Sequence, residues 1–324
     1  MLPHRMISLL LACTSSLAVV EKHPRDSGTA DTADTADTAD TSDTEPVPVD
    51  YDCDALPSAP VEDNELTAPR GYHDVLISGD GYAYGFDGNS IVRSTYEGPL
   101  EVFLPRAGNI QQMDWLPDGD MVVGDDFSQD LKRIDNTGVS SVIASGLGAV
   151  YGVVTGPDDH VWVANGPSIY RVDPSTGEAK EWSRLGRGVQ AHSLAFKPGD
   201  PRLFIGSVGT GIVYTVAFDE NYARAGEPEQ YLTIDGTGWH DGVGFDACGN
   251  LFVADYYTSG LYRVAPDLSV TTFFRGRQRA YGHGLEWGNG VGGWRADALY
   301  LPQPYDQNTV REVVIGVPSA WSVE

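Results

Sequence analysis

The 324-residue chain has little positive charge, few cysteines and no long hydrophobic run. Its 21 Lys and Arg residues are outnumbered by 46 Asp and Glu, giving a formal net charge of −25. Because phosphate binding needs clustered basic residues, nucleic acid is excluded as a partner. No apolar stretch is long enough to cross a bilayer as a helix. Apolar residues alternate or occur in fours and fives without a helical stripe, which argues against a helical fold.

Turn-forming and strand-forming residues are abundant instead. The 38 Gly and 20 Pro occur among many Val, Tyr, Phe and Trp residues, a composition typical of short strands joined by tight turns. The sequence therefore predicts an all-β protein.

The first 50 residues have a different composition from the rest. Residues 1–12 combine His4 and Arg5 with a short apolar run, and Leu10-Leu11-Ala12-Cys13 resembles the bacterial lipobox, in which the cysteine carries lipid. We expect residues 1–13 to be a lipoprotein signal and Cys13 to be the only contact with the membrane. The alternative is an ordinary export signal cleaved slightly later. Either reading predicts a protein of the bacterial cell envelope, anchored at the outer membrane or periplasmic face, or exported.

Residues 26–45 repeat Thr-Ala-Asp with almost no apolar side chains. Such a segment cannot bury enough surface to offset its ordering entropy, and its like charges keep it extended. Residues 14–50 are therefore predicted to be a disordered tether that holds a folded domain, residues 51–324, away from the membrane. Calcium binding by the acidic repeats is the alternative.

Two cysteines remain once Cys13 is assigned to lipid, and they are far apart in sequence. In an oxidising compartment Cys53 and Cys248 are expected to form one disulfide, which would tie the lead-in to the body. Two buried thiols are the alternative.

Six repeats of one pattern follow residue 70. Each has an apolar strand with a polar opening and an alternating strand; a Gly/Asp/Pro turn joins them in most repeats, and a third strand is visible in four. The openings are His73, Gln111, Tyr151, His192, Asp241 and His283, separated by 38, 40, 41, 49 and 42 residues. This spacing predicts a six-bladed β-propeller of four-stranded antiparallel blades. The last repeat is short, so the segment after Cys53 is expected to complete it and close the ring.

The fifth repeat carries a family resemblance. Asp241-Gly242, Asp246, Gly249-Asn250 and Val253-Ala254-Asp255 resemble a blade of the gluconolactonase/regucalcin-like and NHL-type propellers, over roughly residues 70–317. The resemblance implies that Asp241 is a metal ligand. The family's asparagine ligand falls at His192 and its glutamate at His73-Asp74, which speaks against calcium and gluconolactone chemistry. His192-Ser193-Leu194-Ala195 is also similar to a strand opening of the three-histidine zinc propeller that acts as the peptidyl-hydroxyglycine amidating lyase.

The strand openings of a propeller form a ring at one mouth of the channel. Three of the chain's seven histidines occupy this ring together with Asp241. Imidazoles with a carboxylate suit a transition metal, so a divalent metal is predicted on His73, His192, Asp241 and His283, with zinc favoured and calcium the alternative. Channel side chains that only hydrogen-bond one another are the competing interpretation.

Further candidates surround this ring. Loops leading to the same mouth carry Arg106, Arg184, Arg187, Arg275, Arg277 and Arg279. A basic rim would attract a carboxylate or phosphate, although loops are also polar for solubility. The residues predicted to act in catalysis are Tyr151, Glu286, Arg187 and Arg277.

We therefore expect a monomeric, envelope-anchored, metal-dependent hydrolase of the lactonase type, or a lyase, acting on a small anionic or carbonyl-containing molecule. A non-catalytic propeller that binds a ligand or protein is the alternative, since this architecture hosts both.

Overall fold

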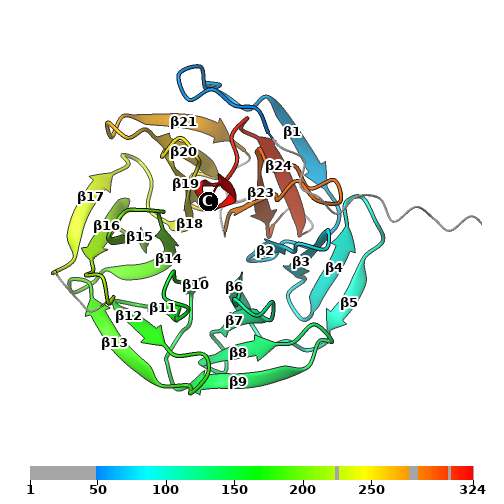
Figure 1. Ribbon diagram of the computed structural model, residues 1–324, viewed down its shortest axis with the longest axis vertical. Coiled ribbons are helices and arrows are strands. Elements are labelled where there is room, and N and C mark those ends of the chain that lie inside the picture. The colour runs from blue at the N-terminus through cyan, green and yellow to red at the C-terminus, as the bar shows by residue number, and fades with distance from the viewer. Residues whose placement is uncertain (1–48, 223–225, 277–283, 306–307, 324) are drawn as a thin grey trace, which may run out of the picture. The chain divides into compact units, whose positions relative to one another are not determined.

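Six antiparallel sheets of four strands are arranged around a central axis in the computed structural model (Figure 1). The structure describes residues 49–222, 226–276, 284–305 and 308–323. The predicted six-bladed β-propeller is confirmed. The predicted signal, residues 1–13, and nearly all of the tether lie outside the described residues. No helix of the described part of the chain is long and apolar enough to span a membrane.

The first three blades each consist of four consecutive strands. Blade 1 contains β2 (Val75–Ile77), β3 (Tyr82–Phe86), β4 (Ile91–Thr95) and β5 (Glu101–Leu104). Blade 2 contains β6 (Ile110–Trp115), β7 (Met121–Asp125), β8 (Asp130–Ile134) and β9 (Ser140–Ser145). Blade 3 contains β10 (Gly152–Thr155), β11 (Val161–Asn165), β12 (Ser168–Val172) and β13 (Ala179–Arg184).

Blades 4 and 5 repeat this order, whereas blade 6 does not. Blade 4 contains β14 (Gln190–Phe196), β15 (Arg202–Val208), β16 (Ile212–Ala217) and β17 (Glu229–Thr233). Blade 5 contains β18 (His240–Phe245), β19 (Leu251–Asp255), β20 (Gly260–Val264) and β21 (Val270–Arg275). Blade 6 contains β22 (Glu286–Trp287), β23 (Ala298–Gln303), β24 (Thr309–Val314) and, from the other end of the chain, β1 (Glu62–Leu66).

The core lies between neighbouring blades. The second strands, such as β7 and β19, are buried along their whole length, whereas an outer strand such as β9 is mostly exposed. Trp162 of blade 3 packs edge-to-face on Phe196 of blade 4 with ring centroids 5.5 Å apart. Burial against both neighbouring blades explains why the second strands read as nearly continuous apolar runs.

The N-terminal strand closes the ring. β1 pairs antiparallel with β24 over five residues, from Glu62 opposite Val314 to Leu66 opposite Val310. The expectation that the lead-in after Cys53 completes the last blade is confirmed. Figure 1 shows β1 at the outer edge of blade 6, beside blade 1.

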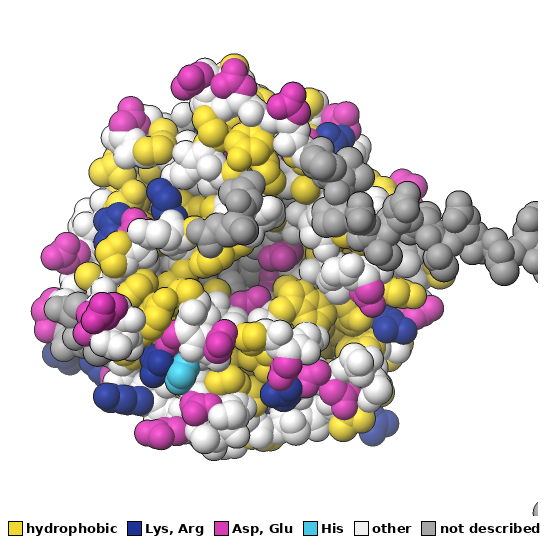
Figure 2. Space-filling model, viewed as in Figure 1, with side chains coloured by type: hydrophobic (Ala, Val, Ile, Leu, Met, Phe, Trp, Pro, Cys, Tyr) yellow, Lys and Arg dark blue, Asp and Glu magenta, His cyan; other side chains and the backbone are white. Residues whose placement is uncertain are grey.

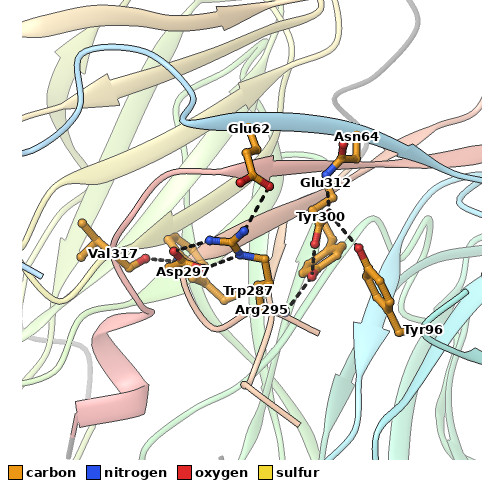
Figure 3. A network of polar contacts seen from close by, with 9 residues as sticks. All are labelled: Glu62, Asn64, Tyr96, Trp287, Arg295, Asp297, Tyr300, Glu312 and Val317. Atoms are coloured by element: carbon orange, nitrogen blue, oxygen red, sulfur yellow. Dashed lines mark hydrogen bonds and ion pairs between the residues drawn. The ribbon is translucent and has the colours of Figure 1, made fainter. Parts of the chain in front are cut away.

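A buried carboxylate consolidates this closure (Figure 3). Glu312 of β24 accepts hydrogen bonds from Tyr300 Oη (2.8 Å), Tyr96 Oη (3.0 Å) and Asn64 Nδ2 (3.0 Å). These donors belong to β23, to the turn after β4 in blade 1, and to β1. Tyr300 is fully buried, and burial together with the charge of Glu312 raises its pKa. One side chain thus joins blade 6, blade 1 and the closing strand.

Both ends of the described chain meet the turn between β18 and β19. Cys53 forms a disulfide with Cys248, which confirms the predicted pairing. Arg263 Nη1 donates to the carbonyl oxygen of Pro57 at 2.6 Å and holds the same lead-in. At the other end, Ser319 pairs with Asp246, and the short 3-10 helix η1 (Ala320–Val323) follows. Figure 1 shows η1 near the centre of the ring.

We expect Glu312→Ala to lower the free energy of unfolding by about 1–3 kcal/mol, because the buried hydroxyl of Tyr300 loses its acceptor, as do the less buried donors on Tyr96 and Asn64. Denaturant unfolding would measure the loss. Glu101→Ala is the control, because its ion pair with Arg93 is exposed and should contribute less than about 1 kcal/mol. Equal losses in the two variants would show that the Glu312 network does not stabilise the ring.

We also expect reduction of Cys53–Cys248 to lower the melting temperature. The cysteines are 195 residues apart in sequence, so chain entropy alone would give the bond up to about 5 kcal/mol. The measurement is thermal unfolding with and without a reductant. Cys53→Ala should unfold at the lower temperature under both conditions; a shift by reductant in that variant would contradict the assignment.

Candidate functional site

The innermost strands carry an irregularity where their polar openings lie. The register between β14 and β15 shifts between Ala191 and Leu194, so His192 and Ser193 stand outside the regular ladder. The same shift occurs in β6 around Gln111 and Gln112, and in β18 around Asp241. A β-bulge re-aims side chains locally. These bulges place the polar residues of blades 2, 4 and 5 inside the channel.

His192 and Asp241 meet across the boundary between blades 4 and 5. His192 Nδ1 lies 3.2 Å from Asp241 Oδ1, and the two side chains are 8% and 0% exposed. At this distance the two atoms are in contact, but His192 Nδ1 forms no hydrogen bond. The imidazole also stacks on Tyr151, which precedes β10 of blade 3, with centroids 5.1 Å apart and planes 16° from parallel. Two of the predicted ligands are therefore adjacent.

Burial shifts both members of this pair toward their neutral forms. It lowers the pKa of His192 to about 3, helped by the nearby His73. It raises the pKa of Asp241, helped by the charge of Asp255. His192 is therefore a neutral imidazole at physiological pH, the form that binds metals. A divalent cation here would favour the ionised carboxylate and leave the imidazole neutral, so the donor chemistry of the pair fits a metal.

His73 presents a defined tautomer. Its Nδ1 lies 2.8 Å from the carbonyl oxygen of Ile110, and a carbonyl only accepts, so Nδ1 carries the proton. The lone pair is then on Nε2. Burial lowers the pKa of His73, partly offset by its bond to Ile110 and by Asp126. A backbone carbonyl that fixes the tautomer is a common support of a metal-binding histidine.

The remaining predicted residues are only partly brought together. His283 and Arg277 lie outside the described residues, so the four-ligand set remains a prediction. Arg187 is exposed in the loop before β14, and Tyr151 covers one face of His192. Among the described residues, no group of three or more His, Cys, Asp or Glu side chains is arranged to hold a metal ion.

Glu286 lies in a different part of the channel. It lines a cavity together with Asp74 and Asp114, and His192 is not among the lining residues. Burial raises the pKa of Glu286, and the charges of Asp114 and Asp74 raise it further. Among the described residues, Glu286 therefore does not share this cavity with Tyr151 or Arg187, the other predicted catalytic residues.

Gln112 divides the channel, and sequence reasoning assigned it no role. Its Nε2 donates to the backbone oxygen of Asp241 at 2.9 Å, across the ring from blade 2 to blade 5. Its Oε1 accepts from Val153 N of blade 3 at 3.1 Å. Two consecutive polar residues inside an apolar strand, Gln111-Gln112, are the available signal, because they break the two-residue alternation of a strand.

Asp255 fixes the loop that leads to Asp241. It ends β19 and accepts hydrogen bonds from the backbone N–H groups of Gly238 (3.1 Å) and Trp239 (2.6 Å). Thr258 Oγ1 donates to its other oxygen at 2.7 Å. Asp125 in blade 2 plays the equivalent part, accepting from Asn109 N at 3.0 Å and from Ser128 Oγ at 2.9 Å. These strand-end acids are structural supports of the mouth.

No protein-family model and no curated protein matches the chain. Several solved structures share its fold. A gluconolactonase from Xanthomonas campestris is 12% identical, with 85% of this chain and 95% of that chain covered and a TM-score of 0.63. Regucalcin from Agrobacterium tumefaciens, a calcium-binding protein, is 16% identical over 79% and 94% of the two chains, with a TM-score of 0.64. Virginiamycin B lyase from Staphylococcus aureus is 16% identical over 78% and 88%, with a TM-score of 0.55. The resemblance to gluconolactonase/regucalcin-like propellers is confirmed at the level of the fold.

We expect Gly152→Ala to disturb the His192 backbone. A Cβ at position 152 would collide with the carbonyl group of His192, which cannot move without shifting the bulge. The free energy of unfolding should fall by about 1–3 kcal/mol, and the near-ultraviolet circular dichroism should change. Gly79→Ala is the control, because nothing lies within 4 Å of its new Cβ. Unchanged stability of Gly152→Ala would contradict the tight approach of blades 3 and 4.

Proposed function

We propose that this protein is a metal-dependent hydrolase of the lactonase type, acting at the channel mouth where the inner strands begin. The observation that carries the proposal is the buried pair His192–Asp241, with Nδ1 and Oδ1 3.2 Å apart and His73 near enough to lower the pKa of His192. Neutral imidazoles beside a carboxylate in a buried channel are the donor set of a divalent metal site.

His73, His192 and Asp241 would hold the metal, together with His283, which lies outside the described residues. When bound, the metal would supply Lewis acidity toward a carbonyl group of the substrate. Two imidazoles favour a transition metal such as zinc, because calcium prefers an all-oxygen shell. Calcium remains an outcome of the experiment below.

The chain's own residues would prepare the site. The carbonyl of Ile110 holds His73 in the tautomer whose Nε2 carries the lone pair, and the ring of Tyr151 shields His192 from water. Arg187, exposed in the loop before β14, would attract an anionic substrate group. Similarity in fold to a gluconolactonase supports a hydrolytic activity without identifying the substrate.

A non-catalytic binding propeller is the second candidate. One observation favours it: no three-donor group is assembled among the residues that the structure describes. In this case the histidines line the channel and the mouth receives a ligand without chemistry.

We further propose an oxidising cell-envelope location, with Cys13 as the lipid attachment site and a monomeric state. The Cys53–Cys248 disulfide supports export, because disulfides persist mainly outside the cytosol.

Metal analysis of the purified protein tests the enzyme hypothesis. We expect near-stoichiometric zinc or another transition metal, and hydrolysis of a lactone or ester from a substrate panel. His192→Ala and Asp241→Asn should each weaken metal binding and activity by about 100-fold or more, because they remove direct ligands.

His160→Ala is the matched control, because His160 lies at the β10–β11 turn, where it bonds to Asp158 and Arg171. It should keep both metal and activity. Bound calcium would favour the oxygen-ligand reading, and a stable wild-type protein that takes up no metal would refute the proposal in favour of a binding propeller.

A further inference from the structure

The cavity that Glu286 lines occupies the channel where the inner strands end. Its volume is about 590 Å³, and we refer to it as the lower cavity. Gln112 forms part of its lining and also bonds to Asp241 O and Val153 N, so it stands between this cavity and the His192–Asp241 pair. Figure 2 shows a hollow at the centre of the ring, with acidic side chains at its base and hydrophobic side chains around it.

The polar part of the lower cavity is acidic. Asp74, Asp114 and Glu286 line it, and no Lys, Arg or His is among its lining residues. Asp74 accepts from Met113 N at 2.8 Å and Asp114 from Thr155 N at 2.6 Å, so both brace neighbouring blades. The backbone of Glu286 pairs with Tyr300, whereas its carboxyl group forms no hydrogen bond or ion pair with another described residue. Among the residues that the structure describes, no side chain competes with a ligand for this carboxyl group.

The walls of the lower cavity are aromatic. Trp115, Phe196, Phe245 and Trp287 line it, each from the inner strand of a different blade. Trp321 of η1, which is 48% exposed, lies at its edge. Aromatic rings attract cations and also cover apolar surface. Carboxyl groups inside such walls would bind a positive group attached to an apolar body.

The residues that line the lower cavity favour an organic cation over an anion or a metal ion. An anion would meet three carboxyl groups and no basic side chain. A metal ion needs several converging donors, and no group of three is arranged for one among the described residues. The volume is that of a small-molecule site, which typically combines apolar walls with a few polar groups.

We propose that the lower cavity binds a small organic cation, an ammonium or guanidinium group on an apolar body, with Glu286 as its charged partner. This site is separate from the proposed metal site, and it would work in a catalytic or a non-catalytic propeller.

Three probes with the same body and different charge test the proposal: 2-phenylethylammonium, 2-phenylethanol and phenylacetate. Hexylammonium serves as an aliphatic second cation. Isothermal titration calorimetry and the fluorescence of the cavity tryptophans would measure binding to the full protein. We expect the two ammonium ions to bind at least about tenfold more tightly than the alcohol, and phenylacetate to bind most weakly.

Glu286→Gln keeps the size of the side chain and removes the carboxyl group that a bound cation would hold in its ionised form. It should weaken ammonium binding at least about tenfold and leave binding of 2-phenylethanol unchanged, a split that a merely structural defect would not produce. Trp321→Ala, at the exposed edge of the lower cavity, is the second variant and should weaken the binding of every probe that enters this cavity. Glu178→Gln is the control, because Glu178 is exposed and does not line the cavity; it should leave the binding of all probes unchanged.

Four outcomes would overturn the proposal. These are no binding of either ammonium ion below about 10 mM, equal affinity for the alcohol and the ammonium ion, unchanged ammonium binding in Glu286→Gln, and a calcium or magnesium ion that binds in place of the ammonium ions.

Discussion

Pairing between β1 and β24 joins the two ends of the folded chain, and the rest of the propeller depends on it. Without β1, blade 6 would lack its outer strand, and Glu312 would lose the Asn64 donor. Because Glu312 also accepts from Tyr96, the same network ties blade 6 to blade 1. A ring closed in this way holds six inner strands at fixed distances from one axis. Only then do side chains from different blades meet in the channel.

Bulges in the inner strands allow polar side chains of different blades to meet in the channel. A regular strand alternates its side chains between two faces, so consecutive polar residues cannot both point to the channel. The register shifts around Gln112, His192 and Asp241 relax that limit. They allow Gln112 to reach Asp241 O on the opposite blade and bring His192 within 3.2 Å of the Asp241 carboxyl.

Gln112 lies between two parts of the channel that carry different side chains. On one side, imidazoles and a carboxyl group fit a divalent metal. On the other, Glu286 and two bracing aspartates lie among aromatic walls without a basic side chain. Burial raises the pKa of carboxyl groups on both sides, and the cation proposed for each side is different: a divalent metal on one and an organic ammonium or guanidinium ion on the other. The two proposals therefore place two different ligands in one channel.

Sequence alone determined the architecture, because each blade repeats a local pattern of strand, turn and strand at a nearly constant spacing. It also predicted the disulfide, once Cys13 was assigned to lipid, and the closing role of the lead-in, and the structure confirmed both. It placed His192 and Asp241 correctly in adjacent blades. Only the tertiary structure showed that Glu286 lies in the lower cavity and that Gln112 divides the channel. The reason is physical: a bulge changes the direction of every following side chain, and contacts across the ring leave no periodic signal in the chain.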